Sequence, residues 1–164
     1  MKYIVFLILL WGSDGLAQTR YLMKTVDIVI PTVLDLQITT GANPIVDFNE
    51  TGKIDAGIEL QSATSITYRS NKAWFITIQA ANANFSGGLA GTPMPASVIG
   101  YRLSGTGNNY TALTATAQPL VATTSSKNVR GTGSYSLDFR IDPGYIYPPA
   151  QDYTLQIIYT ISNL

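Results

Sequence analysis

The sequence predicts an all-β fold, an immunoglobulin-like antiparallel β-sandwich of about seven to nine strands. Three observations support this prediction. Short segments alternate apolar and polar residues, most clearly at 135–141 and 153–161. Turns rich in Gly, Pro and Asn separate these segments, and no segment shows the period of a helix. Alternation with period two places one face of each strand against a core.

Residues 1–17 are predicted to be a secretory signal peptide. Lys2 supplies the positive start, residues 3–11 form a short apolar core, and Gly15 and Ala17 are the small residues that signal peptidase requires. The apolar run is too short to cross a bilayer as a helix, and no later run reaches the necessary length. We therefore expect an exported single domain over residues 18–164, with no integral membrane segment after the signal is removed.

The first strand pattern, at 25–38, is the most informative. Its even positions are apolar except Thr32, and the same parity extends back to Leu22 with one interruption at Lys24. As one ribbon, residues 22–38 would span roughly 56 Å, whereas a compact domain of this size is about 38 Å across. The ribbon must therefore either fold back at Pro31, crossing between the sheets of one molecule, or leave its own domain.

The next strands flank a short turn. Residues 63–70 and 73–80 both read as strands, and Asn71 and Lys72 between them fit a tight hairpin connection. In the second strand, one face is formed by Trp74, Ile76 and Ile78. A shorter strand at 45–48 precedes this pair and leads into a polar turn.

The second half of the chain continues the pattern. Residues 98–103 resume the strand alternation, and 112–127 have the weak apolar content of an edge strand. The strands at 135–141 and 153–161 follow, separated by a turn at 143–150. Polar residues alternate with the apolar ones in both, apart from Ile158, so each has one side for solvent.

The residue types that are missing bear on function. Histidine and cysteine are absent, which removes the commonest general base, most nucleophile–base pairs and the usual zinc sites. The acidic residues fall mostly at outward positions or in turns, where a solvated carboxylate is the default. We expect no enzymatic activity, no catalytic residue and no cofactor. Ten acidic and ten basic residues balance without a basic patch, so nucleic acid is not an expected partner.

One turn partly matches a calcium-binding loop. Asp47, Asn49 and Asp55 have the spacing of ligands in such a loop, with Gly52 at its turn position. The twelfth position, which should be a bidentate acid, is Ile58. A polar turn over 49–57 is therefore favoured, and these three residues remain the metal-ligand candidates.

Aromatic residues in loops suggest an alternative function. Tyr145 and Tyr147 lie in a turn, and Tyr110 follows a loop rich in Gly and Asn. Exposed rings of this kind stack on sugars, although tyrosines at strand ends also cap a sandwich core. The alternative is a monomeric secreted carbohydrate-binding module, with surface glycans as its partners and these tyrosines as the contacts.

Four segments also carry a resemblance to a known group of proteins. They are VDIVIPTVLDLQI at 26–38, IVDF at 45–48, SITYRSNKAWFITIQA at 65–80 and PPAQDYTLQIIYTIS at 148–162. With these segments the chain resembles the exported fimbrial subunits of the archaic chaperone–usher and spore-coat-U group. In that group the first alternating segment is donated to a neighbouring subunit. A cysteine pair usually ties the first strand to the central hairpin there, and this chain has none.

The resemblance implies a function and a set of partners. It implies a non-enzymatic structural subunit of an extracellular fibre, pilus or adhesive surface layer, reaching the cell surface through the periplasm. Its partners would be other copies or related subunits, together with a periplasmic chaperone and an usher. The donated residues would be Leu22, Val26, Ile28 and Ile30. We expect the accepting groove beside the strands at 135–141 and 153–161.

Overall fold

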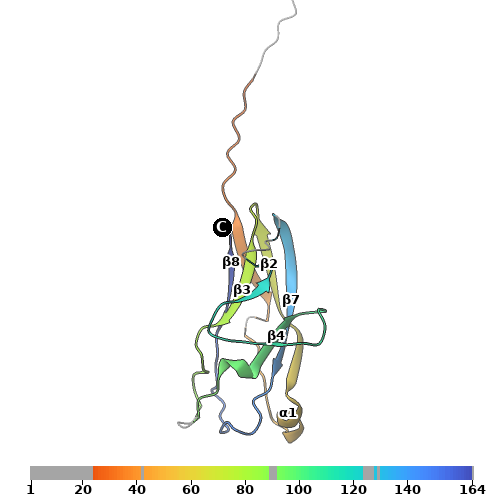
Figure 1. Cartoon of the computed structure of the whole chain (residues 1–164), viewed down its shortest axis with the longest axis vertical. Coiled ribbons are helices and arrows are strands. Elements are labelled where there is room, and N and C mark those ends of the chain that lie inside the picture. Colours follow the sequence, from red (N-terminus) through yellow and green to blue (C-terminus); the bar gives the residue numbers. More distant parts are fainter. Residues whose placement is uncertain (1–23, 42, 89–91, 124–127, 129, 164) are drawn as a thin grey trace, which may run out of the picture. The chain divides into compact units, whose positions relative to one another are not determined.

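The computed structural model shows an antiparallel β-sandwich (Figure 1), which confirms the predicted fold class. It describes residues 24–41, 43–88, 92–123, 128 and 130–163. The predicted signal peptide and Leu22 therefore lie outside the described residues. The chain divides at Pro31 into a short N-terminal unit and the sandwich unit, Pro31–Leu164. Each is described by itself below.

The larger sheet has five strands, with the long strand β2 near its centre. Its order is β1 (Leu34–Thr40), β2 (Ile58–Ser70), β7 (Gly131–Ile141), β4 (Ile99–Leu103) and β5 (Thr111–Ala112). All of its pairs are antiparallel. In β2 the register shifts between Leu60 and Thr64, which marks a β-bulge where β2 pairs with β7.

The smaller sheet has three strands, in the order β6 (Gln118–Val121), β3 (Phe75–Ala80) and β8 (Ile157–Ser162). Both of its pairs are antiparallel. The weakly apolar region 112–127 contains β6, at one edge of the smaller sheet, and its first residue, Ala112, belongs to β5, at one edge of the larger sheet. The predicted edge strand is therefore confirmed at β6.

The core lies between the two sheets. Its largest fully buried side chains are Trp74, Ile66, Ile76, Ile78, Leu113 and Leu137. Trp74, Ile76 and Ile78, which the sequence places on one face of the strand at 73–80, are all buried. Trp74 also packs against Tyr68, with ring centroids 4.1 Å apart. Burial of such large side chains supplies most of the free energy of folding in a chain without disulfides.

The predicted hairpin at Asn71 and Lys72 is wrong in its pairing. This turn connects β2 to β3, but the two strands belong to different sheets. β2 has neighbours on both edges, in β1 and β7, and β3 has neighbours in β6 and β8. Since no edge of β2 is free to take β3, the chain crosses from one sheet to the other at this turn.

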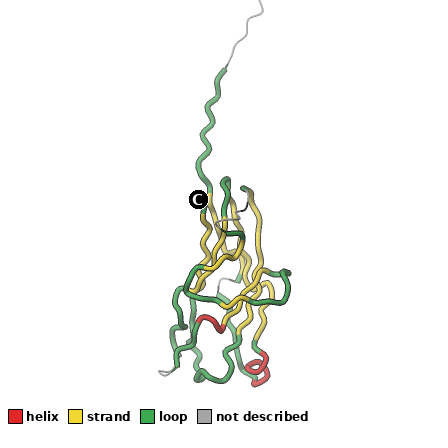
Figure 2. The backbone as a smooth tube through the Cα atoms, viewed as in Figure 1, coloured by secondary structure: helices red, strands yellow, loops and turns green. Residues whose placement is uncertain are grey.

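Two short helices interrupt the strands (Figure 2). α1 (Thr51–Ala56) lies inside the predicted polar turn, and the 3-10 helix η1 (Ala96–Val98) precedes β4. Six residues are too few to show a helical period in the sequence. The strand predicted at 45–48 is absent, because Ile45 is exposed and no neighbouring strand pairs with this segment.

The alternating pattern at 22–38 is not one continuous strand. Its described residues 24–33 form no strand, and β1 begins at Leu34. The reason lies in the register, because Leu34 pairs with Ser70, the last residue of β2. The residues before Leu34 have no strand of the larger sheet beside them, and Pro31 has no N–H to donate to one.

Candidate functional site

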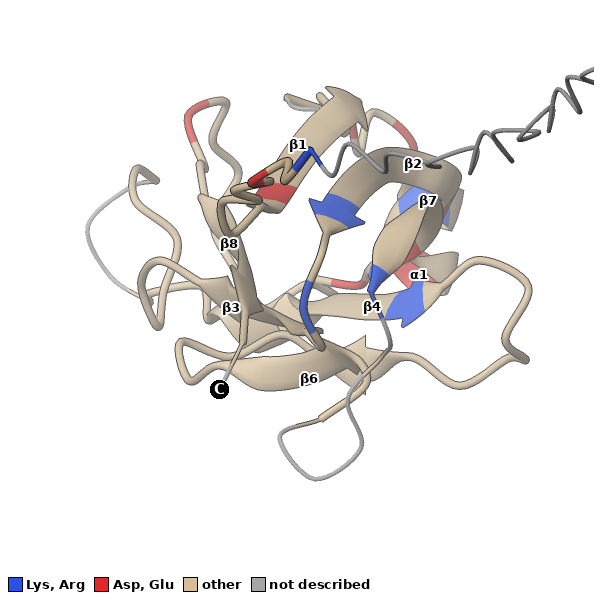
Figure 3. Cartoon of the chain, turned by 90° about the horizontal axis from the view of Figure 1, so that it is seen from above, with Lys and Arg blue, Asp and Glu red and all other residues tan. Residues whose placement is uncertain are grey.

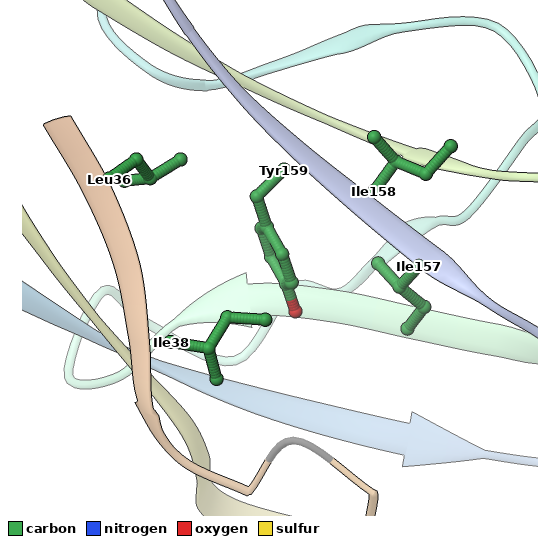
Figure 4. A pocket seen from close by; sticks show the side chains of 5 residues that line it. All are labelled: Leu36, Ile38, Ile157, Ile158 and Tyr159. Carbon is green, nitrogen blue, oxygen red and sulfur yellow. The ribbon is translucent and has the colours of Figure 1, made fainter. Parts of the chain in front are cut away.

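An open apolar groove runs between β1 and β8. Its volume is about 450 Å³, and its lining residues are Leu36, Ile38, Ile157, Ile158 and Tyr159. Figure 4 shows Leu36 and Ile38 of β1 facing the ring of Tyr159 of β8. The sequence predicts an accepting groove beside the strands at 135–141 and 153–161. β8 belongs to the second of these ranges and lines the groove described here, whereas 135–141 lies within the larger sheet as part of β7 and does not line it.

The groove lies where both sheets end. β1 is one of the two edge strands of the larger sheet, and β8 is one of the two edge strands of the smaller sheet. Within the described residues, β1 is paired with β2 alone and β8 with β3 alone. Each therefore has a row of backbone N–H and C=O groups with no strand opposite them, which is a template for a further strand.

Some side chains that line the groove pack against the core, and others are partly exposed to solvent. Leu36, Ile157 and Tyr159 pack against the buried cluster, but Ile38 is 44% exposed and Ile158 is 40% exposed. Isolated exposed apolar residues are ordinary on a protein surface. Here they line one apolar hollow between two unpaired strand edges, and such surfaces mark interaction sites.

Tyr159, which lines the groove, is half-buried. Burial raises the pKa of its hydroxyl to about 12, although a hydrogen bond with the side chain of Thr64 lowers it. The phenol is therefore neutral throughout the physiological range. The three strands of the smaller sheet carry no charged residue, as the tan ribbons of β3, β6 and β8 show (Figure 3). An occupant of the groove would meet an uncharged wall on this side.

The N-terminal unit has exposed apolar side chains. Its described residues, 24–30, are exposed and belong to no strand. The candidate donor residues Val26, Ile28 and Ile30 are 68%, 78% and 76% exposed. Val29, at the other parity, is 90% exposed. None of these four side chains is seated in a core.

The tyrosines of the carbohydrate alternative are separate from the groove and from one another. Tyr110 carries the guanidinium of Arg102 over its ring, 4.4 Å from the centroid. Tyr145 is exposed and donates its hydroxyl to Asp55 Oδ1 at 2.7 Å, whereas Tyr147 is half-buried. No ring-to-ring contact joins these three tyrosines in the described part of the chain.

The candidate metal ligands have other partners. Asn49 Oδ1 accepts a hydrogen bond from Lys53 Nζ at 2.6 Å, and Asp55 is bound by Tyr145. Asp47 is exposed. Among the described residues, no three His, Cys, Asp or Glu side chains gather as a metal site would require.

One buried carboxylate was not anticipated. Alternation predicts Asp138 on the outer face of its strand, but its side chain is buried. It accepts hydrogen bonds from Ser62 N at 2.8 Å, from Ser104 Oγ at 2.5 Å and from Arg102 Nε at 2.9 Å. Burial alone would raise the pKa of this carboxyl, but these bonds and the Arg102 charge together lower it. Ser62 lies in the β2 bulge with φ of 48°. Because its backbone N–H donates to the Asp138 carboxylate, this carboxylate stabilises the bulge.

Comparison with known proteins adds no family to these observations. No protein-family model matches the chain, and a search of curated proteins finds no significant match. Within the residues that the structure describes, no helix is long and apolar enough to cross a membrane.

Proposed function

We propose that this protein is a non-enzymatic structural subunit of an extracellular fibre, and that it assembles by strand donation. In this mechanism the segment 22–30 of one copy enters the groove between β1 and β8 of another. The observation that carries the proposal is the coexistence of an open apolar groove and an exposed apolar segment in the same chain. The predicted export signal and the resemblance to fimbrial subunits support the extracellular setting.

The N-terminal segment and the free edge of β8 have similar lengths. β8 has six residues, and at about 3.4 Å per residue its free edge is roughly 20 Å long. The described residues 24–30, when extended, cover a similar length. Their alternation would place Val26, Ile28 and Ile30 on one face, toward Leu36, Ile38 and Tyr159. Asp27 and Val29 would then face outward.

The arrangement of strand ends gives the contact a direction. Leu34 pairs with Ser70, Ser162 pairs with Phe75, and residues 71–74 connect Ser70 to Phe75. The start of β1 and the end of β8 therefore lie at the same end of the sandwich. The connection to the N-terminal segment, at Pro31, is at that end.

A donated strand would continue the antiparallel order of the smaller sheet, running opposite to β8. Its last residue, Ile30, would then emerge at the start of β8, at the end opposite to Pro31. Each copy would give its segment at one end and receive a segment at the other. Such head-to-tail contacts do not close on themselves and generate filaments.

The carbohydrate-binding alternative has no comparable site among the residues that the structure describes. Tyr110 is covered by Arg102 on one face, and the hydroxyl of Tyr145 is engaged by Asp55. The tyrosines do not form a common platform of the kind that a sugar chain needs. We therefore do not propose this alternative.

A truncation tests strand donation directly. A chain lacking residues 18–31 keeps every strand of the sandwich but has no segment to donate. We expect it to be unstable by thermal unfolding, because nothing covers its groove, and to regain stability when a peptide of residues 22–30 is added. As a matched control, the same peptide with Ile28→Asp should give no recovery, whereas the peptide with Val29→Asp should. Full stability of the truncated chain without any peptide would refute donation.

A further inference from the structure

Asn71 holds the start of the first strand with three hydrogen bonds. Its side-chain Nδ2 donates to the carbonyl oxygen of Pro31 at 2.7 Å, and its Oδ1 accepts from Val33 N at 2.9 Å. Its backbone N–H donates to the carbonyl oxygen of Val33 at 3.2 Å. These bonds, which we call the Asn71 clamp, join the turn between β2 and β3 to the residues that connect the N-terminal segment to β1.

The apolar pattern alone does not determine whether the groove is filled by the N-terminal segment of the same molecule or by that of a second copy. The Asn71 clamp bears on this choice. If residues 31–33 formed a three-residue hairpin loop, a common length, the segment would fold back along β1 of its own molecule. Ile30 would then face Leu34, Ile28 would face Leu36 and Val26 would face Ile38. Leu36 and Ile38 are the β1 residues that line the groove. The parity of the chain's own segment therefore suits its own groove.

The Asn71 clamp opposes that hairpin. It engages both backbone groups of Val33 and the carbonyl of Pro31, which lie within the residues that would have to turn. Residues 31–33 form neither turn nor bend. In the described residues, positive φ outside glycine occurs at Ser62 and Ala122, so the backbone at Asn71 does not itself require asparagine. The side chain is needed for its two hydrogen bonds.

We infer that the Asn71 clamp keeps the N-terminal segment out of its own groove, so that the groove accepts a second copy of this chain. Asn71 is thus a positioning residue, which acts on assembly without lying in the groove. This inference rests on the proposed strand donation. It adds the reason why a chain whose pattern permits self-insertion would form filaments.

The test compares full mature chains, residues 18–164, carrying Asn71→Ala or the matched control Asn109→Ala. Asn109 is an exposed asparagine in the loop between β4 and β5. Light scattering gives the multimer distribution, and hydrogen exchange reports protection of amides 26–30 in the monomer fraction. Loss of two neutral hydrogen bonds should shift the ratio of self-inserted to open chains by roughly 25-fold. We expect Asn71→Ala to lower the multimer fraction and to protect residues 26–30 in monomers, with Asn109→Ala behaving as wild type.

A disulfide variant keeps the test decisive should Asn71→Ala fail to fold. Residues 33 and 71 continue the register in which Leu34 pairs with Ser70, and Cα atoms of antiparallel pairs lie about 4.5–5.5 Å apart, within the range that a disulfide bridges. Val33→Cys with Asn71→Cys should form multimers when oxidised and self-inserted monomers when reduced.

The outcomes separate this inference from the proposed function. Wild-type multimers that Asn71→Ala leaves unchanged, or equal behaviour of the oxidised and reduced disulfide variant, would overturn the role of the clamp alone. A wild-type chain that stays monomeric, with unprotected residues 26–30 at every concentration, would overturn strand donation and this inference with it.

Discussion

Replacing Ile28 with alanine should weaken the contact between copies by a predictable amount. Ile28 is 78% exposed in the free segment, so nearly all of its side chain is available for burial in a groove. The change to alanine removes three carbon atoms, each worth about 0.8 kcal/mol on burial, and correction for the exposed share leaves about 2 kcal/mol. At about 1.4 kcal/mol per factor of ten, the dissociation constant should rise about 25-fold.

The matched control is Val29→Ala. Val29 is apolar and 90% exposed, but its parity turns it away from a groove that accepts Ile28. Its replacement should change the dissociation constant by less than about twofold, because an exposed surface substitution has a small effect. The comparison separates insertion of a strand in register from unspecific adhesion of an apolar peptide.

Competition between peptides measures this ratio. A labelled wild-type peptide of residues 22–30 is bound to the chain lacking residues 18–31, and unlabelled Ile28→Ala or Val29→Ala peptides displace it. Equal displacement by the two variants would refute the reasoning. So would a stronger effect of Val29→Ala, because it would mean that the opposite face of the segment enters the groove.

Two further predictions concern the sandwich itself. The pKa of Asp138 is lowered in the folded chain, so its carboxylate stabilises the fold above the carboxyl's ordinary pKa, and this stability is lost as the pH falls through the lowered value. Asp138→Asn should lower the free energy of unfolding at neutral pH by about 3 kcal/mol and flatten its acid dependence, as denaturant titration at several pH values would measure; an unchanged acid dependence would contradict this. Gly41→Ala should destabilise the fold by more than about 1 kcal/mol, because a Cβ there would lie 1.6 Å from the carbonyl oxygen of Ala63 and φ is +68°. An unchanged melting temperature would contradict it.

Alternation predicted the inner faces of the strands well. Trp74, Ile78 and Leu137 are buried, as their positions in the pattern require. The reason is that period two is a property of the extended backbone, so one strand carries the information by itself. The same pattern identified the segment ahead of Pro31 as apolar on one side.

The alternation pattern does not predict which strands, distant in the chain, pair with each other. The turn at Asn71 was interpreted as a hairpin because a short connection usually joins neighbouring strands, but β2 has β1 and β7 on its edges. Alternation alone places Asp138 on the outer face. Its partners Arg102 and Ser104 lie 36 and 34 residues away in the chain, so a local pattern does not reveal them. The β1 wall of the groove was missed for the same reason, since only the completed sheet shows which strand is its edge.

The lack of charge in β8 determines how such a filament would respond to its surroundings. β8 reads IIYTIS, and the smaller sheet has no acidic or basic side chain in its strands. A contact built on that wall would draw its strength from excluded water and backbone pairing, which dissolved ions screen little. Contacts of this kind between subunits would have similar strength at low and at high ionic strength. They would loosen in the cold, where the hydrophobic driving force fades.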